Sequence, residues 1–357
     1  MKIQKFTICN LAFLLAVILG LSSCSKDNVE PKDDVFQFGN GLVILNEGGF
    51  NANNATLSYF DNDKEVLVAD VFQSVNSRGL GDVGNDLSIY GSKMYIVMNA
   101  SGTLEVVNTK TAKSLKQVSF KDGNTNRQPR YIVFNGKKAF ISSFDGTVAV
   151  LDTASLAIEK YINVGRNPDQ MAISNGKLYV ANSGGLSFPN YDNSVSVIDL
   201  NTLEEIKKIT VVMNPGKIAA DKYGDVYVLS SGNYNDVSPA LNIISSTTDE
   251  VASTINNFEG SSITISGDMA YFTTYTGVKV FDVRTETTVK EQFVSDGTQI
   301  SIPYGVTVNE AKSEVFITDA VDYAGSKGKI HCFNKAGNKK YSLTAGLFPG
   351  RIVFVNK

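Results

Sequence analysis

The sequence has little of what many enzymes use for chemistry: its 357 residues include one His, three Cys and no Trp. A single imidazole, His331, argues against Ser-His-Asp catalysis and against a metal site built from several histidines. An excess of one charge is lacking too, because 33 Lys and Arg stand against 36 Asp and Glu, a formal net charge of −3. Without a basic field, the chain is not expected to bind nucleic acid.

The apolar run near the N-terminus is too short to span a bilayer. This run, Leu11–Leu21, follows two lysines and has the length of the core of a secretory signal peptide. It ends in Leu21-Ser22-Ser23-Cys24, which resembles the lipobox of bacterial lipoproteins. We therefore predict that residues 1–23 are a signal peptide and that Cys24 is the lipidation site.

The segment that follows has few apolar residues. Ser25–Asp34 is charged and contains a Pro, a composition that favours a flexible tether, and we place this tether over residues 24–38. Its acidic character resembles the surface-export signal of Bacteroidetes lipoproteins. That resemblance implies display on the extracellular face of the outer membrane, with the lipid as the only membrane contact. Cys332 then has no disulfide partner and lies in a strand-like run, so we predict a buried, inert thiol.

Glycine, phenylalanine and tyrosine, by contrast, are plentiful (30, 20 and 15 residues), and the chain repeats itself. Each copy joins a strand-like run such as Lys177–Asn182 to a second one such as Ser194–Asp199. A turn initiated by an Asp, Asn or Ser side chain follows. The seven turns begin at Asp61, Asn108, Asp152, Asp199, Ser245, Asp282 and Asn334. Their mean spacing of about 45 residues is that of a four-stranded propeller blade.

Prolines mark a second register. Those that precede an apolar stretch, as at the first residue of a strand, are Pro129, Pro168, Pro215, Pro303 and Pro349. The first copy lacks such an inner strand, whereas the C-terminal run 349–355 has no blade after it. We therefore predict an all-β fold over residues 39–357, a seven-bladed β-propeller closed by pairing of the C-terminal strand with the first blade. Two β-sandwiches, the alternative, would not explain a repeat across the whole chain.

The connections of such a ring would differ between its two faces. Those expected to be long share one face and comprise 46–55, 72–85, 120–129, 181–194, 230–240, 295–303 and 318–329. They are rich in Asn, Tyr and Phe and carry several Arg, which suits a large, neutral-polar ligand with flat parts. The binding residues predicted from them are Phe50, Asn51, Arg127, Arg130, Arg166, Asn190, Tyr191, Asn233, Tyr234, Tyr304 and Tyr323. For each residue taken singly, a role in loop formation or packing is the competing interpretation.

No catalytic residue is predicted, and the chain is not expected to be an enzyme. Gly79–Gly84 matches the spacing of a phosphate-binding loop only loosely and opens no helix. Acidic loop residues could hold a structural Ca²⁺ through oxygen ligands, although no EF-hand loop is present, so a metal site stays undetermined. No cofactor is predicted.

Two resemblances carry the functional expectation. Leu178–Asn182 with Val195–Asp199 is similar to the repeat of YVTN/YncE-like surface-layer and periplasmic propellers. Gly41–Phe50 with Asn54–Asp61, together with the lipobox and the acidic tether, resembles the surface propeller lipoproteins of Bacteroidetes, among them the cobalamin-binding BtuG-type family. This resemblance implies non-covalent binding of cobalamin or another corrinoid, as ligand rather than cofactor. It also implies transfer of the corrinoid to a TonB-dependent outer-membrane transporter as partner.

Two other functions remain open. One is a glycan- or protein-binding surface module, and the other is a propeller hydrolase or lyase. A cobalamin transporter or a polysaccharide-utilisation pair among the neighbouring genes would separate capture of a corrinoid from capture of a glycan. A buried metal with an open coordination position on the central axis would favour the enzyme. Because His331 lies within a strand-like run, a bound corrinoid is expected to keep its cobalt without a His ligand from this chain.

Overall fold

The computed structural model describes residues 36–356, which begin with two aromatic rings packed on the first blade. Phe36 and Phe38, which we placed at the end of the tether, have ring centroids 5.8 and 4.9 Å from that of Tyr59. Packing therefore starts slightly before the predicted residue 39. The predicted signal peptide, the lipidation site and most of the tether lie outside the described residues. Within residues 36–356, no helix is long and apolar enough to cross a membrane.

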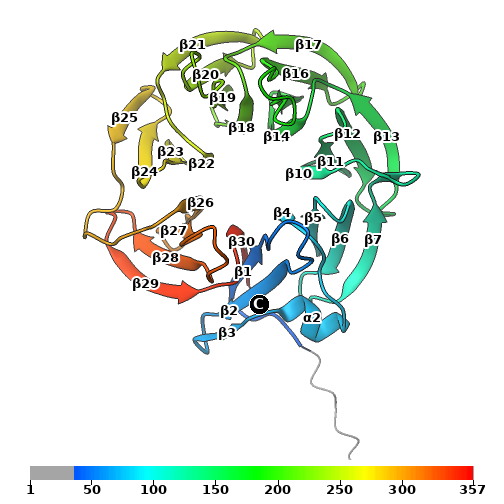
Figure 1. Cartoon of the computed structure of the whole chain (residues 1–357), viewed down its shortest axis with the longest axis vertical. Coiled ribbons are helices and arrows are strands. Elements are labelled where there is room, and N and C mark those ends of the chain that lie inside the picture. Colours follow the sequence, from blue (N-terminus) through cyan, green and yellow to red (C-terminus); the bar gives the residue numbers. More distant parts are fainter. Residues whose placement is uncertain (1–35, 357) are drawn as a thin grey trace, which may run out of the picture. The chain divides into compact units, whose positions relative to one another are not determined.

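The described residues form seven four-stranded antiparallel sheets in a ring around a central axis (Figure 1). From the axis outward, blade 1 consists of β30 (Pro349–Val355), β1 (Gly41–Asn46), β2 (Thr56–Asp61) and β3 (Val66–Val68). Blade 2 consists of β4 (Gly84–Tyr90), β5 (Lys93–Met98), β6 (Thr103–Asn108) and β7 (Ser114–Ser119). Blade 3 consists of β10 (Pro129–Asn135), β11 (Lys138–Ser143), β12 (Thr147–Asp152) and β13 (Ile158–Asn163).

The remaining four blades follow the same order along the chain. Blade 4 consists of β14 (Pro168–Ser174), β15 (Lys177–Asn182), β16 (Ser194–Asp199) and β17 (Glu204–Thr210). Blade 5 consists of β18 (Pro215–Ala220), β19 (Asp225–Ser230), β20 (Ala240–Ser245) and β21 (Glu250–Asn256). Blade 6 consists of β22 (Ser262–Ser266), β23 (Met269–Thr273), β24 (Val278–Asp282) and β25 (Thr287–Lys290). Blade 7 consists of β26 (Pro303–Asn309), β27 (Glu314–Asp319), β28 (Lys329–Asn334) and β29 (Lys339–Thr344).

The ring closes as the sequence predicts, with the last strand completing the first blade. β30 pairs antiparallel with β1, with Val353 opposite Val43 and Ile352 opposite Ile44. The five predicted prolines each stand at the first residue of an inner strand, where a missing N–H costs no ladder bond. The fold is therefore a seven-bladed β-propeller.

The turns that close the outer hairpins are held by local hydrogen bonds. At Asp152, the side-chain oxygen accepts from the backbone N–H of Ala154 (3.1 Å) and Ser155 (2.7 Å). The equivalent acceptors are Asp61, Asn108, Asp199, Asp282 and Asn334, and Ser245 makes a longer contact of 3.4 Å. These turns confirm the predicted repeat, and they lie on the face that we call the short-turn face.

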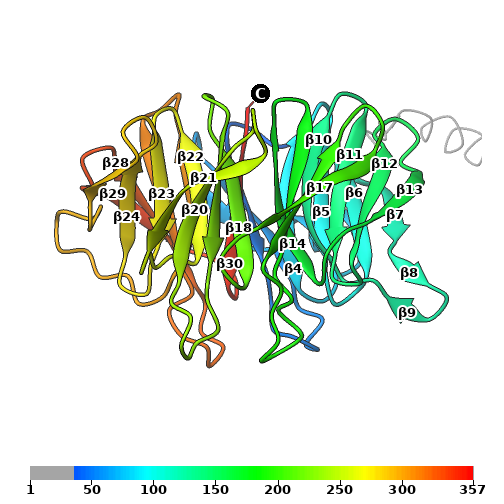
Figure 2. The same cartoon turned by 90° about the horizontal axis from the view of Figure 1, so that it is seen from above.

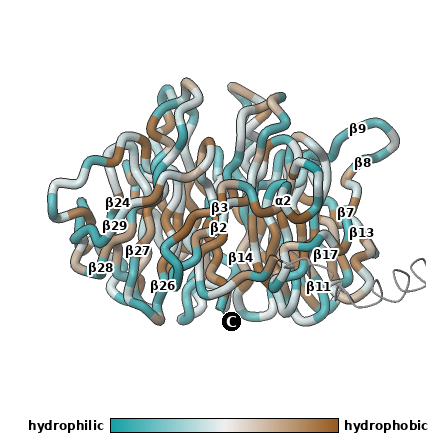
Figure 3. Tube along the Cα trace, turned by 90° about the horizontal axis from the view of Figure 1, so that it is seen from below, coloured by the Kyte–Doolittle hydropathy of each residue, from teal (hydrophilic) through white to brown (hydrophobic). Residues whose placement is uncertain are grey.

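Apolar side chains fill the space between neighbouring blades, so the core is divided into a layer between each pair of sheets. An aromatic residue recurs at the third position of the second strand in six blades: Tyr95, Phe140, Tyr179, Tyr227, Tyr271 and Phe316, all buried. Tyr227 also donates from its hydroxyl to the carbonyl of Val283 in the next blade (3.0 Å). The hydropathy pattern in Figure 3 agrees, since apolar segments follow the strands and hydrophilic ones dominate the loops. Cys332 is fully buried, and burial raises the pKa of its thiol to about 11, as expected of an inert cysteine.

The face opposite the short turns carries the connections between second and third strands and between blades, and we call it the long-loop face. Figure 2 shows the longest of these loops projecting from one side of the ring, while the C-terminus ends on the other. Two predicted loops contain secondary structure. The segment 72–85 overlaps a helix, α2 (Val71–Asn76), which Asp70 caps by accepting from the N–H of Gln73 (3.1 Å). Its buried residues Val71 and Phe72 supply the packing that a six-residue helix needs.

The loop 120–129 contains the second such element, a short hairpin of β8 (Lys121–Asp122) and β9 (Thr125–Asn126). Elsewhere the long loops are tied down by asparagines that end the second strands. Asn46 accepts from the N–H of Gly346 (2.8 Å) and donates to Ser58 (2.8 Å). Asn182 does the same with Gly165 (3.1 Å) and Ser196 (2.9 Å). These repeated asparagines are buried and link a blade to the connection that precedes it.

Candidate functional site

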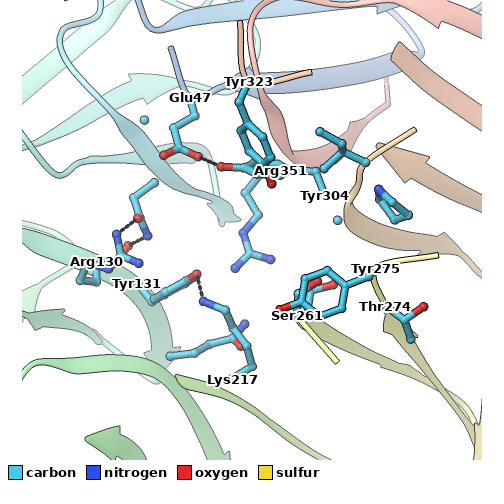
Figure 4. Close-up of a pocket in the computed structure, with 18 of the residues that line it drawn as sticks. Glu47, Arg130, Tyr131, Lys217, Ser261, Thr274, Tyr275, Tyr304, Tyr323 and Arg351 are labelled. Carbon is cyan, nitrogen blue, oxygen red and sulfur yellow. Dashed lines mark hydrogen bonds between the residues drawn. The ribbon is translucent and has the colours of Figure 1, made fainter. Parts of the chain in front are cut away.

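A cavity of about 440 Å³ opens on the long-loop face where the inner strands of all seven blades begin. We call it the axial pocket. Its wall contains four tyrosines and three basic side chains, with amides and hydroxyls between them (Figure 4). The polar and aromatic lining residues are Glu47, Asn85, Arg130, Tyr131, Gln170, Lys217, Ser261, Ser262, Thr274, Tyr275, Ser301, Tyr304, Tyr323 and Arg351.

The pocket wall is built by a repeat in the sequence. The third position of each proline-initiated inner strand reaches the axis, and the β22 and β4 strands supply the matching positions of blades 6 and 2. This inner ring consists of Asp86, Tyr131, Gln170, Lys217, Ser262, Gly305 and Arg351. Several of its members link neighbouring blades, since Gln170 accepts from the N–H of Ile218 (3.1 Å) and Asp86 from that of Ile132 (3.0 Å).

One carboxylate in the wall serves two cations. Asp169 accepts from Nε of Arg130 (3.0 Å) through one oxygen and from Nζ of Lys217 (3.2 Å) through the other. Burial disfavours the charged carboxylate, but the two cations outweigh this effect and lower the pKa of Asp169. Arg130 is further fixed by Asn85 and by the ring of Phe144, 4.5 Å from its guanidinium carbon. Arg130 is therefore held firmly at both ends of its head group.

A second ion pair lies across the axis. Nε of Arg351 is 3.0 Å from Asp86, while the terminal nitrogens of Arg351 point into the open pocket (Figure 4). Burial raises the pKa of Asp86 in spite of the nearby Arg351 charge. Arg351 and Lys217 both lie near the ring of Tyr131, at 5.1 and 4.9 Å from its centroid. The wall thus presents a group of cations around one phenol.

Glu47 and Tyr304 form the third polar contact of the pocket. The Tyr304 hydroxyl donates to the Glu47 carboxylate, although the two residues are far apart in sequence. Burial raises the pKa of Glu47, against the hydrogen bond from Tyr304 and the charges of Arg130 and Lys217. Glu47 is thus held by Tyr304 at the wall of the pocket, next to the cations Arg130 and Lys217.

A second cavity of about 320 Å³ adjoins the axial pocket and shares Lys217, Ser261, Thr274 and Tyr275 with it. Exposed aromatic side chains stand around the two openings. Tyr275 (79% exposed) belongs to both cavities, Tyr323 (74%) to the first and Tyr234 (68%) to the second. Phe50, 74% exposed, lies on the same loop as Glu47. We call these four residues the aromatic rim.

The structure brings some of the predicted binding residues to these cavities. Arg130, Tyr304 and Tyr323 line the axial pocket, and Tyr234 lines the adjoining cavity. Phe50 belongs to the rim, and Asn51 beside it is exposed with a left-handed backbone (φ 60°). The ring of Tyr191 contacts that of Tyr234 at 6.1 Å.

The other predicted residues are used to shape the loops. Arg166, on the connection between β13 and β14, donates to the carbonyls of Asn190 (2.8 Å) and Tyr191 (3.0 Å), so its head group holds the neighbouring 183–193 loop. Asn233 accepts three backbone N–H bonds within its loop and donates to Asp236. Arg127 is paired with Asp122 (2.9 Å) and Asp145 (2.5 Å). The competing interpretation, loop formation, thus describes these side chains.

Sequence reasoning missed Tyr131, Gln170, Lys217, Tyr275 and Arg351. A signal was present for four of them, because Tyr131, Gln170, Lys217 and Arg351 each stand two residues after an inner-strand proline. The search concentrated on long loops instead, so side chains that inner strands carry to the axis were passed over. Among the described residues, no group of three or more His, Cys, Asp and Glu is placed to hold a metal ion.

The fold and the position of this pocket define a β-propeller with a polar cavity on its axis. The chain belongs to the family described as a domain of unknown function (DUF5074), whose model matches residues 40–355. No curated protein matches the chain.

Among solved structures, the chain is similar to the hydrazine synthase of Kuenenia stuttgartiensis, with a TM-score of 0.60 and 14% identity over 75% of this chain and 93% of that chain. It is also similar to the computationally designed Ika8 protein, with a TM-score of 0.56 and 14% identity over 88% of this chain and 90% of that chain. At this level of identity the likeness shows the fold alone.

Proposed function

We propose that this propeller is a non-enzymatic binding protein that captures a corrinoid of the cobalamin class over the axial pocket. The observation that carries the proposal is the aromatic rim, four large side chains between 68 and 79% exposed, of which Tyr234, Tyr275 and Tyr323 line the two adjoining cavities. A cluster of large, solvent-exposed aromatic side chains around a cavity indicates a surface that binds a ligand or a partner. Their flat faces suit a ligand with flat apolar parts.

The polar groups between the aromatics suit the rest of such a ligand. A corrinoid carries amide side chains around its ring and is larger than either cavity, so it would lie across both openings. Asn85, Gln170 and Ser261 offer amide and hydroxyl groups at the cavity wall. The only histidine of the sequence is buried in β28, where its Nδ1 lies 2.8 Å from Ser342 Oγ. The proposed capture therefore leaves cobalt without a His ligand from this chain.

Hydrogen bonds within the protein hold the loops of the binding face in place without a ligand. Arg166 donates hydrogen bonds to two carbonyls of the 183–193 connection, and Asn233 accepts from backbone N–H groups within the 231–239 connection. A preformed surface loses little conformational entropy on binding, which favours high affinity from many weak contacts. The predicted loop residues thus support capture by stiffening the face rather than by touching the ligand.

The lipid anchor at Cys24, the extracellular face of the outer membrane and transfer to a TonB-dependent transporter belong to the same proposal. They are supported by the signal sequence, the acidic tether and the resemblance to YVTN/YncE-like and BtuG-type propellers. The glycan alternative is retained as an outcome of the test, because aromatic side chains also stack on sugar rings.

Isothermal titration of the full-length protein, purified in detergent, with cyanocobalamin tests the proposal. We expect one-to-one binding, and we expect the double variant Tyr275→Ala/Tyr323→Ala to lose at least about tenfold in affinity. The exposed Tyr223, which lies in the β18–β19 turn of the short-turn face, gives a matched control as Tyr223→Ala. Absence of heat with cyanocobalamin well above micromolar concentration would overturn corrinoid capture. Heat with an oligosaccharide panel would then favour the glycan module.

A further inference from the structure

The axial pocket contains more positive charge than its ion pairs neutralise. Three basic side chains, Arg130, Lys217 and Arg351, line it, and two carboxylates, Asp86 and Asp169, pair with them. Asp169 is shared by Arg130 and Lys217, so one of these cations lacks a carboxylate of its own. Glu47, the remaining acid at the pocket, accepts a hydrogen bond from Tyr304, and the ion pairs of the three cations use Asp86 and Asp169 instead. Cations that are incompletely paired in a partly buried cavity favour an anionic guest.

The three cations differ in how free their head groups are. Arg130 is fixed by Asp169, Asn85 and Phe144. Arg351 places Nε on Asp86, lies near the ring of Tyr131 and directs its terminal nitrogens into the pocket (Figure 4). Its side chain keeps 27% exposure. Lys217, with 23% exposure, extends from another blade toward the same phenol. Arg351 and Lys217 are therefore the two cations that a guest in the pocket would meet.

Tyr131 lies between these two cations and supplies a third donor. Its hydroxyl accepts from Nζ of Lys217 (2.8 Å), so its own proton remains available to an acceptor. The phenol, the ammonium and the guanidinium come from β10, β18 and β30 and approach the axis from three directions. Donors on several sides match a tetrahedral oxyanion better than a planar carboxylate, whose two oxygens lie in one plane.

We infer that Arg351, Lys217 and Tyr131 form an anion site that takes a phosphate or phosphodiester group at the bottom of the ligand-binding face. The inference rests on the proposed function where it assigns this group to a corrinoid, whose nucleotide loop contains one phosphodiester. The existence of the anion site does not depend on the proposed function, because inorganic phosphate would bind to the same three donors. Binding of the phosphate group at this depth would fix the orientation of a ligand that contacts the exposed aromatic rim.

The first arm of the test uses inorganic phosphate alone. We expect phosphate to raise the melting temperature of the full-length protein above that in sodium chloride of equal ionic strength. Lys217→Met, which leaves Arg130 to pair with Asp169, is expected to abolish this difference. Lys279→Met is the matched control, since Lys279 also lies over an aromatic ring, Phe258, and pairs with an acid, Glu291, but stands outside both cavities. Equal melting temperatures of wild type in the two salts would overturn the site.

The second arm compares two corrinoids by titration calorimetry. Cyanocobalamin contains the phosphodiester, whereas dicyanocobinamide lacks it. We expect Lys217→Met to weaken cyanocobalamin binding by about 10- to 100-fold, the range for a charge-assisted hydrogen bond, and dicyanocobinamide by less than about threefold. Phosphate should compete with the first ligand and not with the second, a measurement on wild type that needs no variant to fold. Equal loss for both ligands would overturn the assignment of the phosphodiester and leave capture standing, whereas failure of both ligands to bind would overturn capture and leave the phosphate arm to decide the site.

Discussion

The two faces of this propeller are organised over different distances along the chain. On the short-turn face, each outer hairpin is closed by a side chain that bonds to backbone groups two or three residues ahead, as Asp152 does. The long-loop face also contains bonds that join distant segments, as in Asn46 to Gly346 or Tyr304 to Glu47. A face built from local contacts repeats with the sequence, whereas a face built from long-range contacts can differ from blade to blade. Only the second kind provides an asymmetric cavity for a ligand.

Removal of the longest-range contact gives the largest expected effect. Deletion of residues 349–357 takes β30 away from β1 and exposes the inner edge of blade 1, so we expect loss of cooperative thermal unfolding by circular dichroism. Deletion of residues 356–357 alone removes no strand residue and should leave the transition unchanged. A cooperative transition at the wild-type temperature in the longer deletion would contradict closure by β30.

Asp319 on the long-loop face and Asp152 on the short-turn face give a matched pair. Burial alone would raise the pKa of Asp319, but the nearby imidazole of His331 (3.6 Å) and bonds from the N–H groups of Ser301, Ile302 and Val321 outweigh burial and lower this pKa to about 2. Because the folded pKa is depressed, its stabilisation is present above pH 4 and disappears as the pH falls toward 2. Asp319→Asn should cost about 2 kcal/mol at pH 7 and remove this acid dependence.

Asp152→Asn, by contrast, keeps an oxygen acceptor in an exposed turn, so urea denaturation should show a much smaller change for this variant. The comparison between the faces would be wrong if the two substitutions destabilised the protein equally. Chemical denaturation at pH 7 and pH 3 measures both effects in one experiment.

The aromatic residues of the two faces should differ in binding and agree in stability. Tyr323→Ala on the aromatic rim is expected to weaken ligand binding about threefold to tenfold, whereas Tyr223→Ala should leave it unchanged. Both side chains are mostly exposed, so neither substitution should move the free energy of unfolding by more than about 0.5 kcal/mol. A loss of stability in Tyr323→Ala would mean that this ring packs on the fold instead of serving a ligand.

Substitution of Glu47 is expected to give the smallest of these effects, a change in how stability depends on pH. Since burial raises the pKa of Glu47 in the folded protein, the contribution of this residue to stability is fully present below the unfolded value of 4.5 and is lost as the pH rises through the folded pKa. Glu47→Gln keeps an acceptor for Tyr304 and should flatten this part of the pH profile, with a gain below about 1 kcal/mol at pH 7. A profile identical to that of wild type would show that Glu47 ionises freely.

The sequence predicted what depends on period and on near neighbours. Turn acceptors such as Asp152, inner-strand prolines such as Pro349 and the unpaired last strand are each visible within a few residues, and all three were confirmed. The helix α2 was not predicted from the sequence, because its stability comes from the burial of Val71 and Phe72 and not from a long amphipathic pattern. The axial pocket was missed for a related reason, since its wall takes one to three residues from each of seven strands and the rest from loops.

Loop composition was a poor guide to which side chains face the pocket. Arg127, Arg130 and Arg166 look alike in the sequence, yet Asp122 and Asp145 occupy the first and two loop carbonyls occupy the third. Only the partners, which lie on other segments, decide whether a cation is free. Arg351, on a strand rather than a loop, is the one whose terminal nitrogens reach the opening.

Closure by the C-terminal strand also has a consequence for biosynthesis. Blade 1 is the first to leave the ribosome and the last to be completed, because about 300 residues separate β1 from β30. At roughly 5–20 residues per second, the inner edge of β1 waits on the order of 15–60 s for its partner. During that interval each nascent chain carries an open strand that the finished ring conceals. Chaperones that hold the chain unfolded would act during this interval. A chain truncated before residue 349 would lack β30, so its first blade could not be completed.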